Sequence, residues 1–77
     1  MEKNIDAFAP VLRQLRHGND LTQEQLSEKL GVAAPYVSML ESGRKYPNLE
    51  MFFKIAQAFG IKPSQMMAEM EKRLGMD

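Results

Sequence analysis

The sequence contains no cysteine, and this absence removes several classes of site at once. Without thiols the chain can form no disulfide, no thiolate metal site and no cysteine nucleophile, a composition that suits a reducing cytoplasm. Its single histidine, His17, cannot form a metal site alone, and no glycine-rich phosphate loop or metal-ligand spacing is present. We therefore expect no cofactor, no bound metal and no enzymatic activity.

Long apolar runs and an excess of one charge are lacking as well. No apolar stretch approaches the roughly 20 residues that span a bilayer, and the first four residues lack the basic-then-apolar order of a signal peptide. We expect a soluble, cytoplasmic protein without membrane contact. Ten basic and ten acidic residues cancel, whereas nucleic-acid-binding proteins usually carry a basic excess. Any such function must therefore be argued from where the charges lie.

Glycine and proline divide the chain into short helical segments. The length of 77 residues supports one domain, residues 1–77. Each glycine follows an amphipathic stretch, as expected of residues that close helices in the left-handed conformation; they are Gly18, Gly31, Gly43, Gly60 and Gly75. Three prolines lie just before or within the first turn of the next stretch, namely Pro35, Pro47 and Pro63. The pattern predicts an all-α fold of five helices.

The first two helices are predicted from their apolar faces and caps. A first helix from about Asp6 to His17 places four apolar residues on one face, namely Ile5, Phe8, Leu12 and Leu15. Pro10 fits this start poorly, so we expect an irregular beginning. A second helix, 23–30, begins at a capping box formed by Thr22 and Gln25.

Three further helices complete the predicted bundle. They span 34–42, the stretch after an Asn48 cap, and 63–74. The residues expected to face inward from the fourth helix are Leu49, Phe52, Ile55, Ala56 and Phe59. The second and third helices are joined by a three-residue turn that begins at Gly31, which is the geometry of a helix-turn-helix motif, residues 22–41.

The residues of this motif resemble a known family. Leu21 to Val32 reads LTQEQLSEKLGV and Val37 to Gly43 reads VSMLESG, and together they are similar to the phage Cro and repressor type of helix-turn-helix domain, the lambda-repressor-like family. The likeness covers roughly residues 8–67. It implies a five-helix DNA-binding domain that acts on double-stranded DNA as a sequence-specific transcriptional regulator.

The resemblance also implies where DNA is contacted. Backbone phosphate contacts are expected at Gln23, Ser42, Arg44, Lys45, Tyr46 and Asn48. Groove contacts are expected at Ala34, Pro35, Tyr36, Ser38 and Met39. This recognition helix lacks the Arg, Asn and Gln side chains that make bidentate base contacts, so we expect weak direct readout and a larger share for DNA shape. Tyr36 either reaches the DNA or packs at the edge of the bundle.

Two charged residues are expected to have a structural role instead. Arg16 and Glu41 match a pair that in the family ties the first helix to the end of the third by a salt bridge. Arg13 is interpreted as either a phosphate contact or a solvated charge.

The last predicted helix carries more methionine than one core needs. Met66 and Met70 share a face that can cover the bundle, whereas Met67 and Leu74 point elsewhere and favour a second copy, so we expect a homodimer. Two alternatives stay open. The chain is either the antitoxin of a toxin–antitoxin pair, with a toxin as partner, or a helical protein-interaction module that no longer binds DNA.

Overall fold

The computed structural model describes residues 7–76, which form five helices and no strand. The helices are α1 (Phe8–Gly18), α2 (Gln23–Leu30), α3 (Ala34–Glu41), α4 (Leu49–Ala58) and α5 (Pro63–Arg73). The predicted all-α, five-helix fold is confirmed. The third and fifth helices each end one residue earlier than predicted. Ile5 and the predicted start at Asp6 lie outside the described residues.

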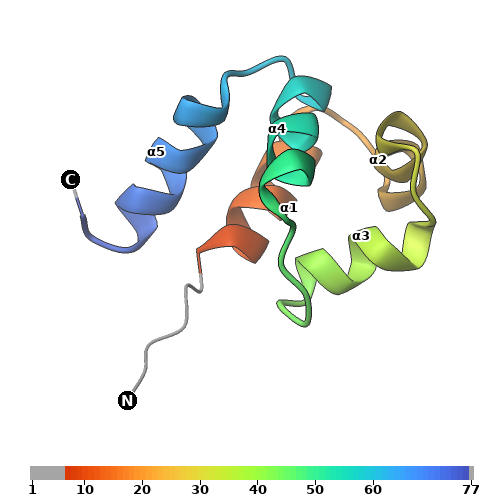
Figure 1. The fold of residues 1–77 in the computed structure, drawn as a ribbon, viewed down its shortest axis with the longest axis horizontal. Helices are drawn as coiled ribbons and strands as arrows, with labels where there is room; N and C mark the ends of the chain where they lie inside the picture. Colours follow the sequence, from red (N-terminus) through yellow and green to blue (C-terminus); the bar gives the residue numbers. More distant parts are fainter. Residues whose placement is uncertain (1–6, 77) are drawn as a thin grey trace.

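Two helices in the middle of the molecule hold the other three. Figure 1 shows α2 and α3 on one side of α1 and α4, with α5 on the other side. All five helices contribute to one apolar core, which contains Phe8, Val11, Leu12, Leu26, Leu30, Val37, Leu40, Phe52, Ile55, Ala56, Phe59, Met66 and Met70. The rings of Phe8 and Phe52 lie 6.1 Å apart between centroids and join α1 to α4. Burial of this apolar surface fixes α2 and α3 on a common base.

The start of α1 differs from the prediction in a way that accommodates its proline. The helix begins at Phe8, so Pro10 is its third residue. The first turn of a helix has N–H groups without intrahelical partners, so the missing N–H of Pro10 costs no hydrogen bond. The N–H of Val11 makes the first such bond, to the carbonyl of Ala7 at 3.2 Å. The predicted irregular stretch is therefore wrong.

One of the five glycines also behaves differently from the prediction. Gly18 is the last residue of α1, and the left-handed conformation after that helix is taken by Asp20, with φ of 56°. The four other glycines have positive φ as predicted. At Gly31, φ of 72° ends α2 and turns the chain into α3, a conformation that a side chain would strain.

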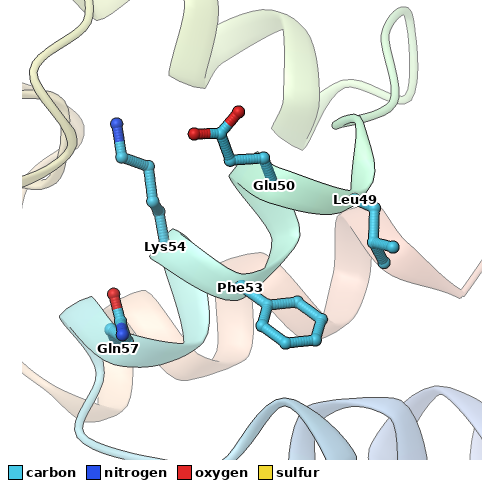
Figure 2. Close-up of a pocket in the computed structure, with 5 residues that line it drawn as sticks. All are labelled: Leu49, Glu50, Phe53, Lys54 and Gln57. Carbon is cyan, nitrogen blue, oxygen red and sulfur yellow. The ribbon is translucent and has the colours of Figure 1, made fainter.

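The prediction for Leu49 is wrong, because its side chain faces outward. Leu49 is the first residue of α4 and is 72% exposed, whereas Phe52 and Ile55 are buried. Phe53, which follows it by one helical turn, is 49% exposed. Figure 2 shows Leu49 and Phe53 leaving α4 on one side, with Glu50 and Lys54 on another. An apolar strip therefore remains uncovered along α4.

Candidate nucleic-acid interface

The helix-turn-helix motif is built from α2, the turn at Gly31 and α3. Its start is secured by the predicted capping box: Thr22 Oγ1 accepts from the N–H of Gln25 at 3.0 Å, and the N–H of Thr22 donates to Oε1 of Gln25 at 2.9 Å. Leu26 on α2 and Leu40 on α3 are fully buried. These contacts hold the two helices in a fixed relation and leave the outer face of α3 exposed.

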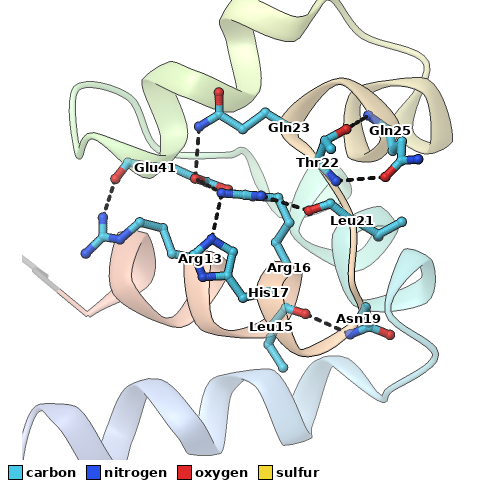
Figure 3. Close-up of polar contacts among 10 residues, drawn as sticks. All are labelled: Arg13, Leu15, Arg16, His17, Asn19, Leu21, Thr22, Gln23, Gln25 and Glu41. Atoms are coloured by element: carbon cyan, nitrogen blue, oxygen red, sulfur yellow. Dashed lines mark hydrogen bonds and ion pairs between the residues drawn. The ribbon is translucent and has the colours of Figure 1, made fainter.

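A buried carboxylate at the end of α3 ties the motif to α1. Glu41 is 4% exposed and pairs with Arg16, as the resemblance implied. Nε of Arg16 donates to Oε2 at 2.5 Å and Nη2 donates to Oε1 at 3.0 Å, so the contact is bidentate. Nη1 of Arg16 donates to the carbonyl of Leu21 at 2.8 Å. Figure 3 shows this cluster at the meeting point of α1, α2 and α3.

Two residues join this cluster in roles that the sequence reasoning missed. Arg13 Nη1 donates a short hydrogen bond to the backbone carbonyl of Glu41, so Arg13 binds the end of α3. Gln23 Nε2 donates to Oε1 of Glu41 at 3.0 Å. The spacing of Arg13 and Arg16, three residues apart on one helix, could have indicated that they share a partner. We define the Glu41 cluster as Arg13, Arg16, Gln23 and Glu41.

The pKa of Glu41 shows which interactions prevail in the cluster. Burial by itself would raise the pKa of this carboxyl group, but the hydrogen bonds from Arg16 and Gln23 and the charge of Arg16 outweigh it, so the pKa is lowered. The hydrogen bond to Glu41 raises the pKa of Arg16. Both groups are therefore charged at neutral pH.

The outer face of α3 has few polar groups. Pro35 and Ser38 are exposed, and Ala34 and Met39 are partly exposed. Tyr36 packs against the core, which supports the second of its two predicted positions. The residue that caps α3, Ala33, has no side-chain hydrogen bond to offer the first turn.

The loop between α3 and α4 collects cations and hydrogen-bonding groups. Arg44, Lys45 and Tyr46 are exposed. Ser42 Oγ donates to the carbonyl of Met39 at 3.1 Å, so this hydroxyl already serves the end of α3. Asn48 Oδ1 accepts from the N–H of Met51 at 2.7 Å and caps α4, which leaves its amide N–H groups for another partner. The loop thus presents donors beside the recognition helix.

Other kinds of site find no support in the described part of the chain. Within residues 7–76, no group of three or more His, Asp or Glu side chains could hold a metal ion. No helix in that range is long and apolar enough to cross a membrane.

Comparison with known proteins identifies relatives of the motif. Residues 12–66 match the family described as helix-turn-helix. The HTH-type transcriptional activator BcrR of Enterococcus faecalis is 41% identical over 61 residues, which are 79% of this chain and 30% of that protein. The chain therefore spans less than a third of that relative.

Solved structures of similar proteins share the whole fold. The clp gene regulator ClgR of Corynebacterium glutamicum has a TM-score of 0.88 and 26% identity, covering 99% of this chain and 82% of that chain. The restriction-modification controller protein C.AhdI of Aeromonas hydrophila has a TM-score of 0.75 and 32% identity, covering 80% of this chain and 94% of that chain.

Proposed function

This chain belongs to the helix-turn-helix family and is a DNA-binding transcriptional regulator, and we propose that it acts in the cytoplasm as a homodimeric repressor or controller protein without catalytic activity. The observation that carries the proposal is the α2–α3 motif, whose two helices are held by a shared core and by the Glu41 cluster. Similarity to a controller protein supports this choice among regulators.

In this proposal, affinity comes mostly from the DNA backbone. Arg44 and Lys45 project from the loop after α3, next to the donor groups of Asn48. Gln23 stands at the first turn of α2, where free N–H groups and the helix dipole favour an anion. Contacts of these kinds position a protein on a duplex without reading its sequence.

Base discrimination is modest in this proposal because α3 presents small and apolar side chains. Ala34 and Met39 can pack against thymine methyl groups, and Ser38 can bond to a base or a phosphate. None of them makes the bidentate contact that Arg makes to guanine. We expect a share of the specificity to come from the shape and deformability of the site.

The homodimer is proposed because apolar side chains on α4 and α5 remain exposed. Met67 and Leu74 on or next to α5 are 43% and 41% exposed, as predicted, and Leu49 and Phe53 on α4 add to them. The helices α4 and α5 are in contact, on the side of the molecule away from α3 (Figure 1). A second copy would cover this surface and leave both recognition helices free.

A dimer also answers the objection raised by the zero net charge. Two copies double the phosphate contacts and address two half-sites about 34 Å apart. Acidic side chains elsewhere then limit non-specific binding without blocking the α3–α4 loop.

Selection from random duplexes at two salt concentrations tests the DNA-binding proposal. We expect an enriched pseudo-palindromic site whose binding weakens steeply as salt rises. Failure to enrich any duplex, together with absence of binding to the DNA upstream of its own gene, would contradict it.

Sedimentation of a Phe53→Glu, Met67→Glu variant tests the homodimer. A buried pair of like charges should convert the dimer to a monomer, while Gln14→Glu on an exposed site of α1 should not. If both variants sediment like the wild-type chain, the dimer surface lies elsewhere.

A protein partner is the second candidate occupant of this surface, since the same exposed apolar side chains could bind a toxin or another protein. Expression with the neighbouring genes and co-purification distinguishes this from self-association. An unchanged activity in Arg44→Glu, Lys45→Glu would favour a protein-interaction module over a DNA-binding one.

A further inference from the structure

The Gln23 side chain connects the start of α2 with the end of α3. Its Nε2 donates to Oε1 of Glu41 at 3.0 Å, and Figure 3 shows the amide nitrogen turned toward Glu41 and the amide oxygen turned away. The accepting carboxylate is 4% exposed and is held on its other side by Arg16. The bond is therefore made to a fixed, buried group.

The chemistry of the two groups determines how the amide is oriented. An ionised carboxylate only accepts hydrogen bonds, whereas an amide has two N–H donors on its nitrogen and an acceptor oxygen. The Glu41 carboxylate therefore accepts the nitrogen end of the Gln23 amide and repels the oxygen end. One N–H is used in this bond, and the second N–H is left for another acceptor.

We propose that Glu41 is a positioning residue for the phosphate contact of Gln23. Glu41 holds one N–H of the amide, and the second N–H donates to a phosphate oxygen of the DNA. Because Glu41 is the last residue of α3, the same carboxylate sets the position of the phosphate contact relative to the recognition helix. This inference rests on the proposed function, in which Gln23 contacts a phosphate.

A double-mutant cycle of Gln23→Ala and Glu41→Gln tests the proposal. Binding of the full chain to a random-sequence duplex at low salt is measured under conditions in which circular dichroism shows every variant folded. Loss of one hydrogen bond should weaken binding about threefold to tenfold in Gln23→Ala. Glu41→Gln should weaken it further in the wild-type background than in the Gln23→Ala background, by a similar factor.

The cycle separates positioning from a purely structural role. A displaced α3 would weaken binding equally in both backgrounds, so equal losses overturn the positioning role and leave the proposed function standing. No loss in Gln23→Ala overturns the phosphate role of Gln23 and the positioning role with it. If the wild-type chain binds no duplex, the proposed function itself fails. Gln14→Ala, an exposed glutamine on α1, is the matched control and should bind normally.

Nuclear magnetic resonance of the wild-type chain provides a measurement that needs no variant to fold. Without DNA, one side-chain amide proton of Gln23 should exchange slowly with solvent, and addition of the duplex should shift the signal of the other. If both protons exchange as fast as those of the exposed Gln57 side chain, the proposal is overturned.

Discussion

At the scale of single residues, Glu41 determines how the recognition helix ends. A carboxylate at a helix C-terminus is unfavourable, because the helix dipole already places partial negative charge there. Arg16 neutralises the side chain, and Arg13 binds the terminal carbonyl of the same residue. Two cations from α1 therefore offset one buried charge and fix α3 on the bundle.

We expect Arg16→Met to destabilise the fold strongly. Removal of one partner leaves the buried Glu41 carboxylate without its main compensating charge, at a cost of about 3 kcal/mol. Urea unfolding measures the loss. The exposed pair of Lys72 and Glu69, 3.4 Å apart, is the control: Lys72→Met should cost less than about 0.5 kcal/mol. Similar losses in both variants would contradict the role given to the buried pair.

The lowered pKa of Glu41 predicts a loss of stability in acid. A carboxyl group whose pKa is lower in the folded than in the unfolded chain contributes stability that is fully present above its unfolded pKa, about 4.3. That contribution is lost as the pH falls through the lower, folded pKa. The difference in unfolding free energy between the wild-type chain and Glu41→Gln should therefore shrink below about pH 4. A difference that is independent of pH would show that the charge of Glu41 is not what stabilises α3.

At the scale of elements, the two helices of the motif start differently. Thr22 and Gln25 cap each other at the start of α2. Ala33 stands in the extended conformation of a cap at the start of α3, yet its side chain has no acceptor. The recognition helix thus depends on its core contacts and its C-terminal anchors more than on its own first turn.

An added cap should strengthen α3. Ala33→Ser places a hydroxyl where it can accept from the free first-turn N–H groups, and we expect about 1 kcal/mol of stabilisation. Thr22→Ala removes the corresponding acceptor from α2 and should destabilise by about the same amount. Thermal unfolding of both variants measures the two effects. Equal signs for the two substitutions would contradict the account.

At the scale of the whole molecule, charge position matters more than net charge. The chain carries ten residues of each sign, yet Arg44 and Lys45 lie together beside the recognition helix. A zero net charge is therefore compatible with a local cationic surface, which is what a phosphate backbone contacts.

Neutralisation of that surface should weaken DNA binding without changing its sequence preference. In Arg44→Gln, Lys45→Gln, each lost phosphate contact should reduce the slope of log affinity against log salt by about 1 per protomer. Titrations of a selected and an unrelated duplex at several salt concentrations measure both quantities. Lys72→Gln, on the far helix α5, should leave the slope unchanged. A changed preference among duplexes would show that the loop reads bases.

Local signals explain how much of the fold was predictable. The cap at Thr22, the closure at Gly31 and the apolar spacing of Leu26, Val37 and Leu40 act within a few residues, and each was found where predicted. The resemblance correctly placed Arg16 beside Glu41. The DNA-contacting roles assigned to the α3 and loop residues stay predictions.

The tertiary structure decided the features that depend on contacts between distant segments. Whether Leu49 is buried depends on which side of α4 meets the other helices, and the first turn lies beyond them. Arg13 and Gln23 acquired their partner only when α1, α2 and α3 met at Glu41. Helix starts and stops are written in neighbouring residues, whereas the orientation of a side chain toward a remote carboxylate exists only after the core has packed.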